Sequence, residues 1–210
     1  MDRIAIFDVD YTLTRRETQV ELVRFMIKKN FSNIRFLPNS ILAGLGNVLK
    51  LKSDKAAKEQ NLKMLAGTSE EELHKIAREF FDKGIRPILY KDSIKAIRRH
   101  HSEGMRVILS SASPDFYIRE FERSPFIEKA LGTTCEIRNG VLTGRILGNN
   151  HKGMEKVHRL NEYLDGQSID WDHSVMYSDS LSDSPLMDLV GKAYLINHRP
   201  TDRYPVLKWK

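Results

Sequence analysis

The sequence has a single cysteine, Cys135, among its 210 residues, and it has no long uninterrupted apolar run. One cysteine excludes an internal disulfide framework and a cysteine-based zinc cluster. The apolar run nearest the amino terminus, Ile4 to Phe7, is far too short for a signal peptide or a spanning helix, and Asp8 ends it. Internal repeats and low-complexity tracts are also missing, which excludes a repeat array. We therefore predict a cytoplasmic protein without a membrane partner.

Charge and hydrophobicity describe a folded chain. Hydrophobic residues make up 40% and charged residues 30% of it, and 34 Lys and Arg against 28 Asp and Glu give a net charge of +6. A positive charge favours an anionic partner such as phosphate, nucleic acid or a membrane surface. The basic residues are spread out along the chain and form only one loose cluster. This cluster lacks the interleaved aromatic residues on which nucleic-acid bases would stack. We interpret it as a solvated helix face and expect no nucleic-acid partner; its members are Lys50, Lys52, Lys55 and Lys58.

Short runs typical of buried strands recur along the chain, and helical patterns separate the last three. This alternation predicts an α/β fold with a Rossmann-like parallel-sheet core. The predicted strands are Ile4 to Phe7, Arg106 to Ser110, Ser174 to Tyr177 and Ala193 to Ile196.

The strand signal vanishes between Thr14 and about Pro87, where helical patterns follow one another. Ser69 and Glu72 form a capping box before the clearest of them. The chain is thus predicted to divide into a core, residues 1–14 and 87–210, and an inserted helical cap, residues 15–86. The predicted cap helices are Glu17 to Lys29, Pro38 to Lys52, Asp54 to Leu65 and Ser69 to Asp82, with a break at Gly84 to Pro87.

Four local signals complete the pattern. Asn139-Gly140 predicts the turn of a β-hairpin within residues 134–146. Ser113 before Pro114 is expected to cap a helix, and Asp183 before Ser184-Pro185 is expected to cap another. The last residues of the chain are expected to form an irregular tail.

Two pairs of aspartates follow predicted strands. Asp8 and Asp10 come directly after the first strand, and Asp179 and Asp183 follow Ser174 to Tyr177. The carboxyl ends of parallel strands meet at one edge of a sheet, so these acids can share a crevice. Close carboxylates are costly unless a cation or a shared proton relieves them. Oxygen ligands without clustered His or Cys favour Mg²⁺ over zinc, with Asp8 and Asp179 as the preferred ligands.

A serine and a lysine offer contacts for phosphate. Ser111 follows the strand Arg106 to Ser110 and comes shortly before a helix start, an arrangement that suits a phosphate oxygen, although Ser110 is an alternative. Lys156 lies at the front of an amphipathic helix and can supply a positive charge. Lys152 is the other candidate for this phosphate contact. The alternative interpretation of Lys156 is a surface lysine on the polar side of the helix.

The ordered set of Asp8-Val9-Asp10-Tyr11-Thr12-Leu13, a serine after a strand, a lysine and Asp179 with Asp183 resembles the haloacid dehalogenase superfamily. The resemblance spans nearly the whole chain. The helical insert between the first two motifs further resembles the subclass that includes phosphoserine phosphatases. The resemblance implies an Mg²⁺-dependent enzyme that hydrolyses a small phosphomonoester from a phosphorylated metabolite.

The resemblance also implies roles for the four acids. Asp8 would attack phosphorus and form an aspartyl-phosphate, and Asp10 would protonate the leaving oxygen and later activate water. Asp8, Asp179 and the backbone carbonyl of Asp10 would bind Mg²⁺. Asp183 would bind it through water or orient the site. Capping of the following helix is the alternative role of Asp183.

Further roles follow for the residues around the phosphate. Ser111 and Lys156 would hold the phosphoryl oxygens, and Glu17 occupies the place of a glutamate that meets a substrate ammonium. A helix-start glutamate stabilised by the helix dipole is the alternative for Glu17. Tyr11 replaces the small residue usual in the family, and Ser111-Ala112-Ser113 replaces a Ser-Gly-Gly turn. These departures favour a small phosphomonoester other than phosphoserine, with an amine as one option.

Two other functions remain as hypotheses. A phosphotransferase would use the same aspartyl-phosphate and pass the phosphoryl group to an alcohol. A non-catalytic module would use the basic surface to bind phosphate or nucleic acid, and its binding would weaken steeply with salt.

Overall fold

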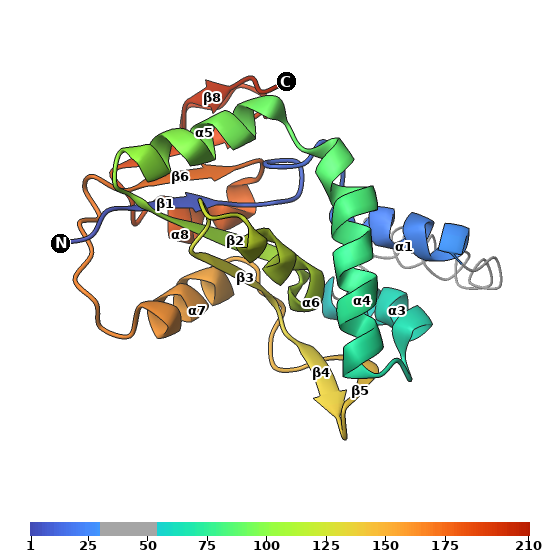
Figure 1. Ribbon diagram of the computed structural model, residues 1–210. Helices are drawn as coiled ribbons and strands as arrows, with labels where there is room; N and C mark the ends of the chain where they lie inside the picture. The colour runs from blue at the N-terminus through green and yellow to red at the C-terminus, as the bar shows by residue number, and fades with distance from the viewer. Residues whose placement is uncertain (30–53) are drawn as a thin grey trace.

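The computed structural model describes residues 1–29 and 54–210 and contains a six-stranded, wholly parallel sheet (Figure 1). The strand order is β3-β2-β1-β6-β7-β8, so the order reverses between β1 and β6. This order, with helices on both faces, confirms the predicted Rossmann-like α/β core. The strands are β1 (Ile4–Phe7), β2 (Arg106–Pro114), β3 (Lys129–Thr133), β6 (Val175–Ser178), β7 (Lys192–Ile196) and β8 (Val206–Leu207).

The central strand β1 is buried on both faces because all four of its residues are apolar. Ala5 and Phe7 pack on the side of helix α5 (Lys91–Ser102). Ile4 and Ile6 pack on the opposite side, with helices α7 (Met154–Leu164) and α8 (Ser184–Met187). Figure 1 shows α5 on one face of the sheet and α7 and α8 on the other. Because side chains alternate along β1, the strand contributes residues to two hydrophobic layers, one on each face of the sheet.

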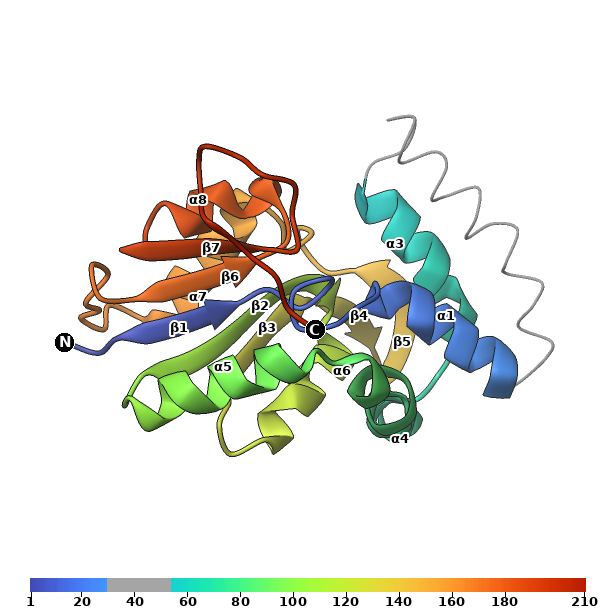
Figure 2. The same ribbon diagram turned by 90° about the horizontal axis from the view of Figure 1, so that it is seen from above.

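The chain after β1 is helical over the described residues 18–29 and 54–88, apart from the link before Ser69, and these helices lie beside one end of the sheet (Figure 2). The hydroxyl of Ser69 accepts a 3.3 Å hydrogen bond from the Glu72 N–H and caps helix α4, as predicted. The helices are α1 (Thr18–Lys29), α3 (Asp54–Leu62), the 3-10 turn η2 (Lys63–Leu65) and α4 (Glu70–Phe80). The predicted helix Pro38 to Lys52 lies outside the described residues.

The predicted break at Gly84 is wrong, because the helical path continues as a π turn, η3 (Phe81–Ile85), and a 3-10 turn, η4 (Arg86–Ile88). The wider π turn brings Gly84 against the ring of Phe80, where a Cβ atom would lie 2.6 Å from the ring carbons. Glycine therefore permits a close contact here and does not end the helix. None of the helices in residues 1–29 and 54–210 has the length and apolarity to cross a bilayer.

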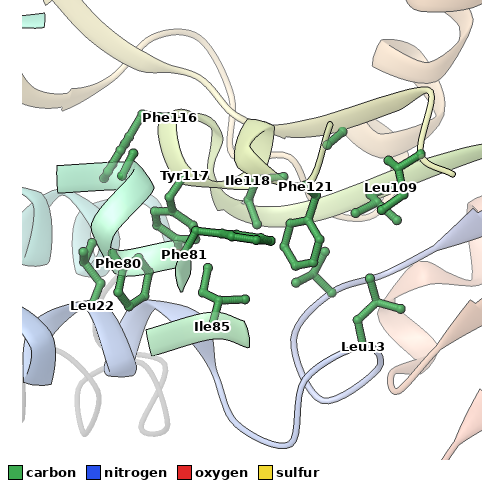
Figure 3. Packing of buried hydrophobic residues seen from close by; sticks show 14 of the residues in the cluster. Leu13, Leu22, Phe80, Phe81, Ile85, Leu109, Phe116, Tyr117, Ile118 and Phe121 are labelled. Carbon is green, nitrogen blue, oxygen red and sulfur yellow. The ribbon is translucent and has the colours of Figure 1, made fainter. Parts of the chain in front are cut away.

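An aromatic cluster joins the inserted helices to the core (Figure 3). The rings of Phe80 from α4 and Tyr117 from α6 (Asp115–Ile118) meet edge to face, with centroids 5.2 Å apart. Phe81 and Phe121, the latter in the 3-10 turn η5 (Arg119–Arg123), make the same kind of contact at 4.9 Å. Such pairs contribute about 0.5–1.5 kcal/mol each beyond their area burial. One continuous hydrophobic cluster thus connects the two parts.

The predicted hairpin is present as the antiparallel pair β4 (Cys135–Arg138) and β5 (Val141–Ile146). Asn139 and Gly140 both have positive φ, 52° and 73°, as a type I′ turn requires. Backbone hydrogen bonds link Leu142 to Gly67 and Thr68 before α4. The hairpin is therefore attached to the inserted helices, although the predicted boundaries place it in the core; the division into 1–14 with 87–210 and 15–86 stays a prediction.

The sequence pattern did not predict two strands. β3 pairs with β2 and extends it to Pro114, four residues beyond the predicted end. Gly132 permits this pairing, because a Cβ atom there would lie 2.7 Å from the Asp115 Cα and 2.8 Å from the Ser113 carbonyl oxygen. The expected irregular tail is also wrong over Val206–Leu207, which pairs with β7 as β8.

Candidate active site

The candidate site lies where the strand order reverses, at the carboxyl ends of β1 and β6, with the end of β2 on the other side of β1. Open α/β sheets bind their ligands at such a reversal, because the connecting loops turn away to opposite faces and leave a crevice. The backbone N–H of Asp8 still donates to the Tyr177 carbonyl at 2.9 Å, so the first acid is fixed to the sheet. The predicted meeting of the motifs at one edge is present.

Asp8 is buried, with 6% of its surface exposed, and both of its carboxylate oxygens are held. Oδ1 accepts a 2.8 Å hydrogen bond from Lys156 Nζ, and Oδ2 accepts a 3.2 Å bond from the Thr12 hydroxyl. Burial raises the pKa of Asp8 to about 8; Lys156 opposes this shift, and the nearby carboxylates reinforce it. Asp8 is thus a fixed, poorly solvated carboxyl group.

Lys156 crosses the site from the first turn of α7 and joins two acids. Its ammonium donates to Asp8 Oδ1 at 2.8 Å and to Asp183 Oδ2 at 2.7 Å, and 2% of the residue is exposed. Burial alone would lower the pKa of Lys156, but the charges of Asp8 and Asp183 outweigh it and raise that pKa above its ordinary value. Lys152, in contrast, is exposed. The structure therefore brings Lys156, and not Lys152, into the site.

Asp183 lies behind this lysine. Its Oδ2 also accepts a 2.8 Å hydrogen bond from the Ser178 hydroxyl, at the end of β6. It precedes helix α8 in the N-cap position, but its side chain forms no hydrogen bond with the first turn of that helix. The capping role that the sequence suggested is therefore wrong, because Lys156 and Ser178 already hold the carboxylate.

Asp179 completes a cluster of acids. Burial raises the pKa of Asp179 to about 6, with a further contribution from Asp183, while Lys156 opposes the shift. In the part of the chain that the structure describes, one buried lysine, which bonds Asp8 and Asp183, stands against four acids whose charges interact: Asp8, Asp10, Asp179 and Asp183. The cluster therefore has an excess of negative charge, and an added cation would relieve it.

The donor set of this cluster fits Mg²⁺. No group of three or more His, Cys, Asp or Glu side chains that could hold a metal ion is found within residues 1–29 and 54–210. Mg²⁺ does not require one, because it binds through one or two carboxylates and keeps several waters. Only oxygen donors are on offer from Asp8, Asp10, Asp179 and Asp183, which suits this hard ion better than zinc.

Asp10 points to the other side of the site, toward the start of α1. Its Oδ1 accepts hydrogen bonds from the N–H and the hydroxyl of Thr18, at 2.6 and 2.7 Å. Its Oδ2 accepts from the hydroxyls of Ser113 at 2.6 Å and Ser111 at 3.4 Å. The two acids of the first motif therefore have separate environments: a lysine holds Asp8, and hydroxyl groups and a backbone N–H hold Asp10.

The serines after β2 divide between two tasks. Ser111 lies beside Asp10, while the hydroxyl of Ser110 is 2.9 Å from His151 Nε2. Ser111 is therefore the serine that faces the site. Ser113 was expected to cap a helix, but β2 runs through Pro114 and the Ser113 hydroxyl donates to Asp10 instead. Sequence reasoning missed Ser113 and Thr18 as site residues, because their positions resemble ordinary helix starts.

Glu17 lies just before α1 and is partly buried. Burial and the charge of Asp10 raise the pKa of the Glu17 carboxyl, and Lys58 opposes this effect. Tyr11 and Glu17 both line a cavity of about 1070 Å³ that extends along α1 to Lys83 and Ile88. None of Asp8, Asp10, Ser111 and Lys156 lines this cavity, so it is the charge interaction with Asp10 that shows Glu17 to lie near the acids.

Lys58 was expected on a solvated helix face, and this is wrong. Its ammonium donates to the Ala112 carbonyl at 2.5 Å and to Asn150 Oδ1 at 2.6 Å, so it links α3 to the end of β2 and to the loop before α7. Lys55 is partly buried and donates to the Gly148 carbonyl at 2.7 Å. The other two members of the predicted face, Lys50 and Lys52, lie outside the described residues.

Two curated proteins named as phosphatases are similar to this chain in sequence. The phosphoserine phosphatase SerB1 of Mycobacterium tuberculosis H37Rv is 27% identical over 197 residues, which cover 92% of this chain and 64% of that protein. The chain thus spans less than two thirds of the length of that relative. A histidinol-phosphatase of Neisseria meningitidis serogroup C is 27% identical over 209 residues, covering 94% of this chain and 91% of the other.

A solved structure extends the similarity to the whole chain. A Bordetella pertussis Tohama I protein of unknown function has 26% sequence identity and a TM-score of 0.85, with 99% of this chain and 98% of the other covered. The family model for haloacid dehalogenase-like hydrolases matches residues 5–188, from the first strand to the helix after the last acidic pair. The resemblance seen in the sequence is confirmed, and the chain belongs to the haloacid dehalogenase-like hydrolase family.

Proposed function

We propose that this enzyme is an Mg²⁺-dependent phosphatase that hydrolyses a small phosphomonoester through an aspartyl-phosphate on Asp8. The observation that carries the proposal is the pair of bonds that Lys156 makes with Asp8 and Asp183 inside the crevice where the strand order reverses. A phosphoryl group in transfer needs positioning and charge neutralisation above all. A buried lysine beside a fixed carboxylate meets both needs.

The reaction divides into two steps. In the first, Asp8 forms a bond to phosphorus while the bond from phosphorus to the ester oxygen breaks, and Asp10 gives that oxygen its proton. In the second, Asp10 takes a proton from water, which attacks phosphorus and releases Asp8 and inorganic phosphate. Asp10 is suited to proton transfer because it lies near Asp8 in the sequence yet is held apart from the lysine.

The other site residues hold the phosphoryl group. Lys156 and Ser111 are placed to contact its oxygens, since both groups border Asp8 or Asp10. A bound Mg²⁺ would neutralise charge on the phosphoryl group, with Asp8, Asp179 and the Asp10 carbonyl as ligands and Asp183 acting through water.

The substrate class follows from Glu17 and from the relatives. Phosphoserine and histidinol phosphate, after which the relatives are named, are both primary alkyl phosphates with an amine on the next carbon. Glu17, whose carboxyl group lies close enough to Asp10 for the two charges to interact, offers a carboxylate to such an ammonium. We therefore propose a small amine-bearing alkyl phosphate as substrate and Glu17 as its recognition residue.

The experiment compares wild type and Asp8→Asn on p-nitrophenyl phosphate, phosphoserine, histidinol phosphate and glycerol 3-phosphate, with Mg²⁺ or EDTA. We expect Mg²⁺-dependent release of phosphate by wild type and a loss of at least about 10³-fold in Asp8→Asn, because the nucleophile is removed. Asp165→Asn is the control, because Asp165 is an exposed residue with φ of 42°, a conformation that asparagine also tolerates. Retained activity in Asp8→Asn would overturn the proposal.

Glu17→Gln tests the substrate class on the same panel. Selective loss on phosphoserine and histidinol phosphate relative to glycerol 3-phosphate would support the amine contact, and equal loss on all three would contradict it. Addition of acceptor alcohols tests the phosphotransferase alternative, since phosphorylated alcohol among the products would favour transfer over hydrolysis.

A further inference from the structure

Asp10 receives more hydrogen bonds than a solvated acid in a loop would need. The Thr18 N–H and hydroxyl donate to Oδ1 at 2.6 and 2.7 Å, and the Ser113 hydroxyl donates to Oδ2 at 2.6 Å. The two residues come from opposite sides of the crevice, one from the start of α1 and the other from the end of β2. Thr18 is 0% and Ser113 is 3% exposed, so water does not compete for these bonds.

With Asp10 as a carboxylate, which only accepts, the protons in this network can be assigned, because each hydroxyl has one proton; the Thr18 and Ser113 oxygens, 3.0 Å apart, then share no proton with each other. Thr18 gives its proton to Asp10 Oδ1, and Ser113 gives its proton to Asp10 Oδ2. The Thr18 oxygen then accepts from the Tyr117 hydroxyl, 3.1 Å away. The network therefore runs in one direction, from Tyr117 through Thr18 to Asp10, with Ser113 as a second donor.

Tyr117 gives this network a rigid support. Its ring is 0% exposed and lies edge to face with Phe80 at 5.2 Å and with Phe116 at 5.1 Å (Figure 3). Burial raises the pKa of the Tyr117 hydroxyl well above its ordinary value, so the group stays protonated and donates. The aromatic cluster between the inserted helices and the core thus fixes the hydroxyl that orients Thr18.

We infer that Ser113 and Thr18, supported by Tyr117, are positioning residues that orient the Asp10 carboxyl group toward the leaving oxygen of the substrate. The inference rests on the proposed function and extends it to residues outside the four motifs. Asp10 itself gives the proton to the ester oxygen as the bond to phosphorus breaks, and Ser113 and Thr18 keep their own protons. Because they act through Asp10, their effect must depend on how much the leaving group needs a proton.

The leaving group supplies the test. An alkoxide needs protonation as it departs, while p-nitrophenolate leaves readily without it. We expect Ser113→Ala and Thr18→Val to lower kcat/KM by about tenfold or more for whichever of phosphoserine, histidinol phosphate and glycerol 3-phosphate the wild type hydrolyses best, and for p-nitrophenyl phosphate by less than about threefold. The parameter kcat/KM is the right one, because it reports the steps through departure of the leaving group and excludes the later attack of water.

Thr18→Val and Thr18→Ser form a matched pair. Valine keeps the shape of threonine and removes the hydroxyl, while serine keeps the hydroxyl. Thr18→Ser should therefore stay within about threefold of wild type on both substrates. Ser93→Ala controls for the loss of a buried serine, since Ser93 is 0% exposed and donates to the Tyr90 carbonyl at 2.8 Å. Equal losses on the alkyl and aryl esters in Ser113→Ala and Thr18→Val would overturn the inference, while Mg²⁺-dependent hydrolysis by wild type would still uphold the phosphatase.

Crystal structures provide a second readout that does not depend on activity. In the double variant Thr18→Val/Ser113→Ala, Asp10 loses two of its hydrogen bonds, and we expect its side chain to adopt another rotamer or to become disordered. The Thr18→Ser variant should keep the wild-type orientation. An unchanged Asp10 side chain in the double variant would refute the positioning role, whatever the enzyme does with either substrate.

Discussion

Replacement of Lys156 by methionine is the most direct perturbation of the site. The lysine is 2% exposed and forms ion pairs of 2.8 Å with Asp8 and 2.7 Å with Asp183. Methionine fills a similar volume but leaves both carboxylates buried without their cation. Removal of one partner from a buried ion pair costs about 3–5 kcal/mol, and little solvent screening reduces that figure here.

Thermal unfolding measures this effect. A change of about 3–5 kcal/mol in a chain of this size lowers the melting temperature by roughly 6–20 °C. Lys152→Met is the matched control, because Lys152 is exposed and lies four residues earlier; we expect a change within about 0.5 kcal/mol. Mg²⁺ should recover part of the loss in Lys156→Met, since a cation bound to the native state stabilises it.

The result that would refute this reasoning is equally plain. A loss below about 1 kcal/mol in Lys156→Met, or an equal loss in both variants, would show that the buried pair does not contribute as its geometry implies. If Lys156→Met loses the expected ~3–5 kcal/mol and Mg²⁺ recovers none of it, the acidic cluster does not bind the ion in the native state.

Three further perturbations test other parts of the structure. Burial lowers the pKa of His151 to about 2, so at pH 5 the unfolded chain binds a proton that the native protein does not bind. The free energy of unfolding should therefore have its full value above about pH 6.5 and be lower by about 2 kcal/mol at pH 5. In urea titrations, His151→Gln should flatten this dependence on pH. Gly132→Ala should cost about 1–3 kcal/mol in thermal unfolding, because its Cβ would lie 2.7 Å from Asp115 Cα; an unchanged melting temperature would contradict the close packing of β3. Burial raises the pKa of the Cys135 thiol, so iodoacetamide should label it at pH 8 only in urea, and rapid labelling of the native protein would disprove its burial.

The local pattern of apolar residues was sufficient to predict the strands at the centre of the sheet. Ile4 to Phe7 is an apolar run that only burial on both faces explains, and two acids end it. The hairpin turn at Asn139-Gly140 was also predictable, because few other dipeptides adopt two successive positive φ angles. Both features depend on residues that are neighbours in the sequence, so they can be predicted from the sequence alone.

The edges of the sheet were not predictable in this way. β3 contains Gly132 and Thr133, and its pairing depends on the close approach of β2, the preceding strand in the chain. β8 has two residues and exists because β7 offers a free edge to it. Short strands of this kind depend on tertiary contacts more than on propensity.

The sequence by itself determined which residues reach the crevice at the reversal of the strand order, because Asp8, Asp10 and Asp179 follow strands, Ser111 lies near the end of one, and parallel strands end at one edge. Only the tertiary structure decided how the acids are partnered. In the folded chain Lys156 donates a hydrogen bond to Asp8, and Ser113 and Thr18 donate hydrogen bonds to Asp10. Those partners are up to 148 residues apart in the chain, and side-chain hydrogen bonds of that kind depend on the packing of whole elements, which no local pattern records.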